Sequence, residues 1–155
     1  ISDYSIKTTR GNKVDCGDVL RRRQEGEYNL VVGVYSQCDD YKVFHTEYTF
    51  FIRPEHESML WGKMNYNKLA EYVNYIKNIP AGREAQQETK TERTVLKNCV
   101  EDKNALVKIH PKVDSKKQRR VQCSVKISEL MTSGIEYKVT AIREFVQSSA
   151  RSFNK

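Results

Sequence analysis

Hydrophobic and polar positions along the chain predict strands and helices in alternation. Residues 2–8 alternate loosely, which predicts a short strand before a polar turn. The run YNLVVGVYS, residues 28–36, is almost continuously apolar, as is typical of a central strand buried on both faces. Between them, residues 16–25 are predicted to form a helix capped by Asp15. Strand, helix and strand in this order form a βαβ unit, which predicts an α/β fold with at least one parallel pair.

The remaining pattern predicts further strands, helices and a hairpin. A helix over residues 65–78 is indicated by Leu69, Tyr72, Val73 and Ile76, which recur at spacings of three and four. Residues 83–99 are helix-prone but polar, so we expect either a solvated surface helix or a helix laid along a partner. The other predicted elements are a strand over 41–54, a β-hairpin of strands 105–113 and 119–127 joined by DSKKQ, a strand over 135–141, and a terminal helix carrying Ile142, Phe145 and Val146. This pattern predicts a mixed central sheet flanked by helices, with an added hairpin.

Length and charge narrow the class of protein. With 155 residues the chain can form one compact domain, so a single domain over residues 1–155 is predicted. Lys and Arg number 27 against 20 Asp and Glu, and the net charge of +7 favours a polyanionic partner. The 4 cysteines form no C-x-x-C pair and no apolar run approaches the ~20 residues of a membrane span, which predicts reduced thiols in a cytoplasmic protein without membrane contact. The chain begins at Ile1 inside an expected strand, so we expect residues upstream of it.

Basic residues are concentrated in a few segments. Arg21–Arg23 are expected on the outer face of the first helix, and a second cluster covers Lys108–Arg120. Positive side chains bind phosphates, while long planar or amide side chains reach base edges, and a two-stranded ribbon fits the major groove of DNA. The predicted DNA contacts are Lys116, Lys117 and Arg119 to phosphates, and Gln118, Arg120 and Gln122 to bases. Arg10 and Lys112 are further predicted DNA-binding residues. Double-stranded DNA is therefore the expected partner.

The opening strand carries Ser5-Ile6-Lys7, within SIKTT, ahead of a polar turn, a carboxylate-bearing segment and a buried strand. This order resembles the core of PD-(D/E)XK nucleases, in particular type II restriction endonucleases, over about residues 1–36. In that family a strand carries acidic-x-Lys and an upstream Asp lies on the adjoining strand. Ser5 stands at the acidic position, as in a subgroup with S-x-K that takes its carboxylate from the following helix. The resemblance implies a restriction-endonuclease-like core with an added basic β-hairpin.

The resemblance also implies a magnesium site beside Lys7. The family holds Mg²⁺ on these carboxylates, and its Lys positions the attacking water. Asp15, Asp18 or Glu25 could supply the helix carboxylate. Asp3 is the only acidic residue ahead of the motif and is too close to lie on a neighbouring strand, so the upstream ligand is expected in residues before Ile1 or on a companion chain. Lys7 and Ser5 are thus the candidate catalytic residues, and Asp18, Asp15 and Asp3 the candidate metal ligands.

These features predict a type II site-specific deoxyribonuclease that cleaves duplex DNA with Mg²⁺. A symmetric recognition site favours a homodimer. The alternatives are a non-catalytic basic module that binds nucleic acid or an acidic protein, and a structural domain whose basicity is incidental. His110-Pro111-Lys112 has the H-x-K spacing of phospholipase D-type nucleases, but Lys117 stands at the expected downstream Asp position.

Overall fold

The computed structural model describes residues 3–113 and 119–147, with the backbone alone for residues 143–147. The described chain forms two compact units, each built from separate segments. The first unit comprises residues 1–14, 27–53 and 126–155, and the second comprises residues 15–26 and 54–125. The α/β class and the mixed sheet are confirmed, while the single endonuclease-like domain stays a prediction.

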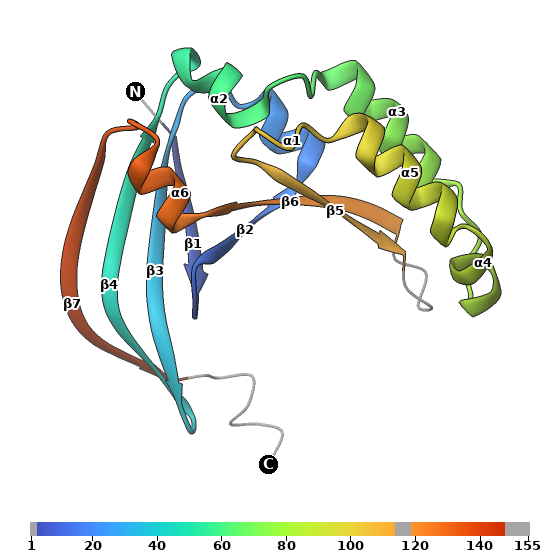
Figure 1. The fold of residues 1–155 in the computed structure, drawn as a ribbon. Coiled ribbons are helices and arrows are strands. Elements are labelled where there is room, and N and C mark those ends of the chain that lie inside the picture. The colour runs from blue at the N-terminus through green and yellow to red at the C-terminus, as the bar shows by residue number, and fades with distance from the viewer. Residues whose placement is uncertain (1–2, 114–118, 148–155) are drawn as a thin grey trace. The chain divides into compact units, whose positions relative to one another are not determined.

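The first unit is built on a mixed four-stranded sheet in the order β1-β3-β4-β7 (Figure 1). Its strands are β1 (Asp3–Thr9), β3 (Tyr28–Cys38), β4 (Tyr41–Ile52) and β7 (Tyr137–Gln147), and its helix is α6 (Ile127–Thr132). β1 pairs with β3 in parallel, whereas β4 is antiparallel to both β3 and β7. The parallel pair predicted from the first 36 residues is therefore confirmed.

Cross-strand pairs fix the core face of this sheet. Leu30 of β3 lies opposite Phe50 of β4, and both side chains are buried. The ring of Phe50 packs 5.6 Å from that of Tyr137 on β7, and stacks at 5.9 Å on that of Tyr48. Ser5 and Lys7 of β1 lie opposite Leu30 and Val32 of β3. Because side chains alternate between the faces of a sheet, Ser5 and Lys7 lie on the same face as Leu30 and Phe50.

The end of β7 corrects one prediction. Residues 142–147 continue the strand, so the predicted terminal helix with Ile142, Phe145 and Val146 is wrong. The physical reason is that β4 is 12 residues long and offers pairing partners from Phe50 back to Tyr41, which the end of β7 takes up. An apolar spacing of three and four was therefore overridden by an available sheet edge.

The second unit is a three-stranded sheet in the order β2-β6-β5 with short helices. Its strands are β2 (Lys13–Asp18), which starts in the first unit, β5 (Lys108–Val113) and β6 (Arg119–Lys126); its helices are α1 (Val19–Gln24), α2 (Glu57–Trp61) after a 3₁₀ turn (Pro54–His56), α3 (Tyr66–Lys77), α4 (Arg83–Glu88) and α5 (Lys90–Val100). β5 and β6 are antiparallel, so the predicted hairpin is confirmed for its strands.

Helix α3 follows the predicted pattern closely. Its N-terminus is capped by Asn65, whose Oδ1 accepts a hydrogen bond of 2.9 Å from the backbone N–H of Lys68. Its apolar stripe is buried, as predicted: Leu69, Tyr72, Val73 and Ile76. α3 contacts α1, α5 and β5, and the stripe therefore forms the centre of this unit's core.

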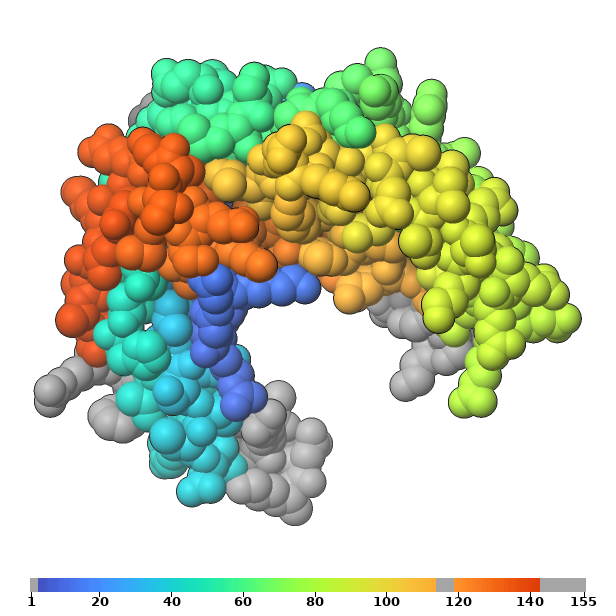
Figure 2. Space-filling view, viewed as in Figure 1, coloured from blue at the N-terminus to red at the C-terminus, as the bar shows by residue number. Residues whose placement is uncertain are grey.

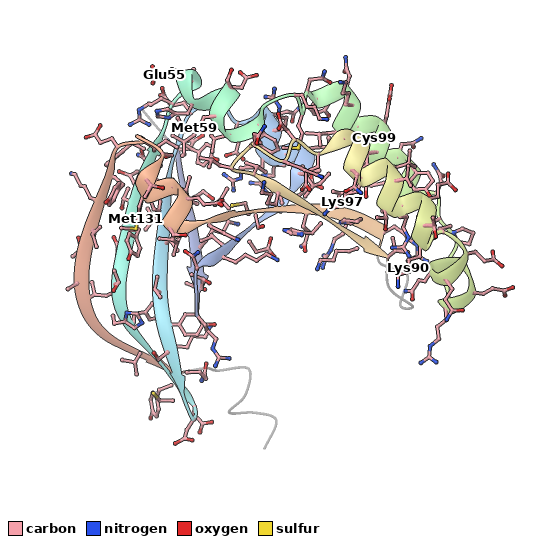
Figure 3. The ribbon with its side chains drawn as sticks, in the orientation of Figure 1. Glu55, Met59, Lys90, Lys97, Cys99 and Met131 are labelled. Carbon is pink, nitrogen blue, oxygen red and sulfur yellow. The ribbon has the colours of Figure 1, made fainter. Side chains whose placement is uncertain are left out.

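Residues 83–100 form two helices where one was predicted. The break falls at Thr89, which ends α4 and precedes α5, and whose Oγ1 donates a 2.6 Å hydrogen bond to the carbonyl of Ala85. No side chain of α4 or α5 is fully buried, and Val95 is 55% exposed. Both helices form outer surface in the space-filling view (Figure 2), and Lys90, Lys97 and Cys99 project from α5 (Figure 3). The polar segment therefore forms two solvent-exposed surface helices, α4 and α5.

Candidate functional site

The motif strand β1 lies at the edge of the first unit's sheet. Ser5 and Lys7 are half-buried and lie opposite Leu30 and Val32 of β3. Ile6, on the other face, is 72% exposed. β1 therefore places the hydroxyl and the ammonium of the S-x-K sequence side by side on one face, two residues apart.

Asp15 and Asp18, the predicted metal ligands, both have local structural roles. The N–H of Gly17, which has φ +79°, donates a 3.0 Å hydrogen bond to Oδ1 of Asp15. Oδ2 of Asp18 accepts a 3.0 Å hydrogen bond from the N–H of Arg21 and caps α1. The prediction that Asp15 caps the helix is wrong because residues 13–18 are extended in β2, which delays the helix start to Val19.

Asp3 lies on β1 together with Lys7, four residues apart. At a rise of about 3.3 Å per residue their Cα atoms lie about 13 Å apart along the strand. Asp3 and Lys7 belong to the first unit, and Asp15 and Asp18 to the second. Over residues 3–113 and 119–147, no group of three His, Cys, Asp or Glu side chains is arranged to hold a metal. The described residues therefore do not assemble the predicted magnesium ligand set.

The arginine cluster Arg21–Arg23 is engaged in folding contacts. Arg22 was predicted to point outward but is only 7% exposed, and its Nη1 lies 3.3 Å from Oε2 of Glu25. Nη2 of Arg23 pairs with Glu57 at 2.7 Å, and its Nε donates a 2.9 Å hydrogen bond to the carbonyl of Met64. The outward prediction is thus wrong for Arg22, because α1 is one turn and a half long and packs this side chain inward. Glu25, the third candidate carboxylate, is the ion-pair partner of Arg21 and Arg22.

The β5–β6 hairpin separates its basic residues between two faces. Arg119 is half-buried and its Nε donates a 2.8 Å hydrogen bond to the carbonyl of Ile79, so it is held by the body of the unit. Lys112 and Arg120 are exposed and lie directly opposite each other in the register. Gln122 lies one rung further along the same face, opposite His110. The hairpin thus presents a polar face, which we call the hairpin face: Lys108, His110, Lys112, Arg120, Gln122 and Ser124.

The opposite side of the hairpin is apolar. Ile109, Val121 and Cys123 are fully buried, and burial raises the pKa of the Cys123 thiol. Cys123 is thus a buried free thiol, whereas Cys38, at the end of β3, is exposed. Of the other predicted DNA contacts, Arg10 is exposed in the turn after β1, while Lys116, Lys117 and Gln118 lie outside the described residues.

His110 and Ser124 were missed as members of the hairpin face. Nε2 of His110 lies 2.7 Å from Oγ of Ser124, a hydrogen bond whose donor depends on the ring tautomer. Ser124 is buried, so this hydroxyl is not accessible as a nucleophile. The alternation K-x-H-x-K in β5 and R-x-Q-x-S in β6 is the sequence signal that places all six residues on one face once the hairpin register is known.

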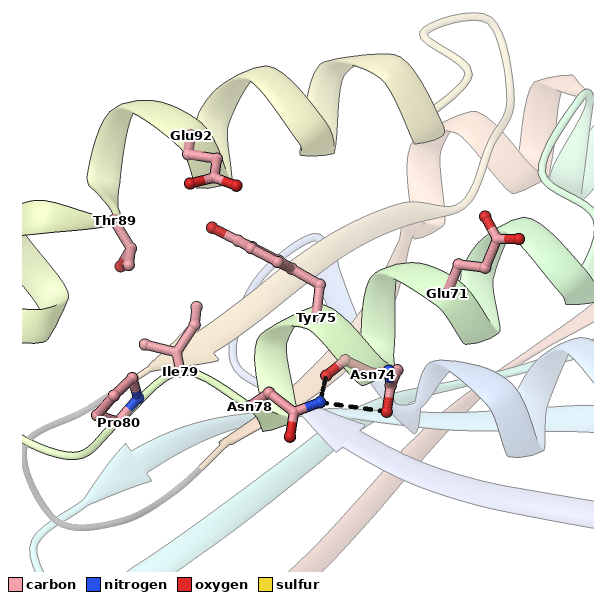
Figure 4. Close-up of a pocket in the computed structure, with 8 residues that line it drawn as sticks. All are labelled: Glu71, Asn74, Tyr75, Asn78, Ile79, Pro80, Thr89 and Glu92. Carbon is pink, nitrogen blue, oxygen red and sulfur yellow. Dashed lines mark hydrogen bonds between the residues drawn. The ribbon is translucent and has the colours of Figure 1, made fainter.

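A separate pocket of about 490 Å³ lies between α3 and α5 (Figure 4). Its lining is Glu71, Asn74, Tyr75, Asn78, Ile79, Pro80, Thr89 and Glu92. Burial and the nearby Glu92 carboxylate raise the pKa of Tyr75, and Nδ2 of Asn78 donates a 2.8 Å hydrogen bond to the carbonyl of Asn74. This acidic and amide lining differs in charge from the hairpin face and does not suit a phosphate.

Within the ranges that the structure describes, every helix is too short or too polar to cross a membrane. Comparisons of the chain with models of protein families, with curated proteins and with solved structures found no match.

Proposed function

We propose that this chain is part of a Mg²⁺-dependent, type II-like endonuclease that cleaves duplex DNA at a specific sequence. The observation that supports this most is the parallel pairing of β1, which bears Ser5-Ile6-Lys7, with β3, since the resemblance requires this arrangement in a restriction-endonuclease-like core. In this proposal the Lys7 ammonium stabilises the negative charge that develops on the attacked phosphate. The hairpin face supplies DNA contacts, and two copies act on a symmetric site as a homodimer.

The metal ligands are the incomplete part of this proposal. Asp18 and Asp15 are the candidate carboxylates, although each already accepts a backbone hydrogen bond. A carboxylate has further lone pairs and can bind an ion while it accepts such a bond. Ligands in residues before Ile1 or on a companion chain belong to the same proposal.

The test is cleavage of supercoiled and linear duplex DNA by the chain with Mg²⁺, measured for the parent and for Lys7→Ala. We expect Lys7→Ala to abolish cleavage and to leave DNA binding within a few-fold. The matched control is Lys138→Ala, which removes an exposed lysine from β7 at the other edge of the same sheet. Cleavage that survives Lys7→Ala contradicts the nuclease proposal.

A non-catalytic nucleic-acid-binding module is the second candidate. It is favoured by one observation: the candidate carboxylates Asp15 and Asp18 serve as a turn acceptor and a helix cap, and no three ligands converge over the described residues. This candidate predicts DNA binding that weakens as salt rises, with no cleaved product under Mg²⁺, Mn²⁺, Ca²⁺ or Zn²⁺. A product with any of these ions rules it out.

A further inference from the structure

We infer that Lys112 and Arg120 together bind one phosphate of the DNA backbone, and that Gln122 reads a base one rung further along the hairpin face. This inference rests on the proposed binding of DNA, and assigns to each residue of that face a separate role. It differs from the expectation drawn from the sequence, in which Arg120 contacts a base.

The first step is the pairing of two like charges. Lys112 and Arg120 are directly opposite each other on adjacent antiparallel strands, where Cβ atoms lie about 4.5–5.5 Å apart. Both are exposed, and neither has an acidic partner within the described ranges. Like charges in this position repel each other, and an anion between them removes the repulsion. A phosphate diester fits because the Arg fork and the Lys ammonium can each donate to one of its two free oxygens.

The second step is the neighbouring rung. Gln122 faces His110 directly, on the same side of the sheet as Arg120 and two residues from it. Two residues of a strand span about 7 Å, so a base edge beside the bound phosphate lies within reach of a Gln side chain. A Gln amide carries one acceptor and two donors, which match N6 and N7 of adenine in the major groove. The expected base is therefore an adenine.

The third step is the support of that rung. The His110 ring is held at 2.7 Å by the buried Ser124 hydroxyl, so its position opposite Gln122 is fixed by the sheet. Behind the rung, Val121 and Cys123 are fully buried, which anchors the β6 backbone on both sides of Gln122. A side chain that recognises a nucleobase gains specificity when the backbone that carries it is rigid.

The phosphate is tested by the salt dependence of binding to random duplex DNA without Mg²⁺. We compare the parent, Lys112→Gln, Arg120→Gln and the double variant, with Lys77→Gln on α3 as an exposed control lysine. Each neutralised phosphate contributes about 0.9 to the slope of log affinity against log salt. One shared phosphate predicts a loss of about 0.9 for the double variant. A loss of about 1.8, or none, overturns the shared site.

The base contact is tested by selection from a randomised duplex pool. We expect the parent protein to enrich an A·T pair at one position of the selected site. Gln122→Met should not enrich this pair, and should lose about 5- to 150-fold in discrimination at that position alone. The control is Gln87→Met on α4, which should enrich the same pool as the parent. If Gln122→Met enriches the same sequences as the parent, the assignment of Gln122 to a base is wrong, while the proposed binding of DNA stands. If the parent binds no DNA, both this inference and the proposed function are wrong. Thermal melting of each variant establishes that it is folded.

Discussion

The two sheets of this protein use the same residue types in different ways. In the second unit, Ile109 of β5 is fully buried beneath the helices, and the side chains on the other face of that sheet are polar. In the first unit, Ile6 of β1 is 72% exposed, and the edge strand carries Lys7 beside it. One sheet separates core from surface cleanly, whereas the other shows apolar side chains at its edge.

This difference bears on where binding residues can be found. On the helix-covered sheet, the apolar face supplies stability, and Lys112 and Arg120 of the hairpin face are exposed with no ion pair to an acidic side chain within the described residues. Around the motif strand, the acidic residues that follow it are engaged in a turn and a helix cap. Uncommitted charge is therefore the better structural sign of a binding surface, and a sequence motif alone does not reveal it.

The largest effect that sharpens this comparison is the removal of matched isoleucines. We expect Ile109→Ala to lower the free energy of unfolding by about 2–5 kcal/mol, because it leaves a cavity in a closed core. Ile6→Ala should change it by less than about 0.5 kcal/mol, since the side chain is mostly in water. Urea unfolding followed by circular dichroism measures both. Equal losses would mean that the edge of the first sheet is buried in solution.

A second, smaller effect separates folding from chemistry at Asp18. Asp18→Ala removes the cap of α1 and should cost about 1 kcal/mol, whereas Asp18→Asn keeps an acceptor for the Arg21 N–H and should cost much less. Urea unfolding gives the stability of each variant, and the cleavage assay gives its activity.

Loss of cleavage in a stable Asp18→Asn variant would support a ligand role, because only the charge is lost. If Asp18→Asn keeps full cleavage, the carboxylate is a cap and no more. The same change at Asp15 tests the other carboxylate, which accepts from Gly17 instead.

Much of the local structure was predictable because single elements decide it. The stripe Leu69 to Ile76 required a helix, and the βαβ order predicted the parallel pair. Strand β2 was not predicted, because the alternation in KVDCGD covers only Lys13–Cys16 and its partner strand β6 lies about a hundred residues away in the chain. The prediction of a helix at the C-terminal end of the described chain was wrong for the same reason. Those residues pair with β4, which lies about ninety residues earlier in the chain.

The candidate site was predictable in part. The pattern of residues 105–127 predicted the basic hairpin and its strands. The pattern could not predict which of the two hairpin arginines is held by a hydrogen bond to the rest of the unit. Arg119 and Arg120 are adjacent in sequence and point to opposite faces. Only the hydrogen bond from Nε of Arg119 to the carbonyl of Ile79, forty residues earlier, shows that Arg119 is held. Long-range contacts therefore decide which members of a charged run remain available.

A third effect concerns the helix layer that distinguishes the second unit. Tyr72 is buried, and its hydroxyl has no hydrogen-bond partner over the described ranges; burial raises its pKa to about 12. A phenol that is buried without a partner costs about 1–3 kcal/mol, so we expect Tyr72→Phe to stabilise the protein by about 1 kcal/mol. Because the folded pKa of Tyr72 lies above the unfolded value of 10, the parent keeps its full stability below pH 10 and loses stability as the pH rises from 10 through 12.

Urea unfolding at pH 7 and at pH 10.5 measures this effect. The gain from Tyr72→Phe should be larger at pH 10.5, because the parent then loses stability to ionisation of Tyr72 in the unfolded chain. Leu69→Met, a volume-conserving change on the same stripe, is the control and should show no such dependence on pH. A destabilising Tyr72→Phe would mean that the hydroxyl has a partner in solution.

The smallest effect lies in the loop that joins α5 to β5. Asp102 accepts hydrogen bonds of 2.9 Å from the N–H groups of Lys63 and Asn104, and these bonds lower its pKa. A lowered folded pKa gives stability that is present above the unfolded value of 3.8 and is lost as the pH falls through the folded value. The difference in urea midpoint between the parent and Asp102→Asn should therefore be largest near pH 6 and shrink below pH 3.8.

Asp39→Asn is the matched control, because Asp39 is exposed in the β3–β4 turn and Asn tolerates its φ of +52°. That variant removes an exposed carboxylate away from the loop that contains Asp102, so its urea midpoint at pH 6 should equal that of the parent. A midpoint difference for Asp102→Asn that stays constant from pH 6 to pH 2.5 would mean that the two backbone bonds are not selective for the ionised carboxylate. Asp102 would then hold this loop through hydrogen bonds that its neutral carboxyl group also accepts.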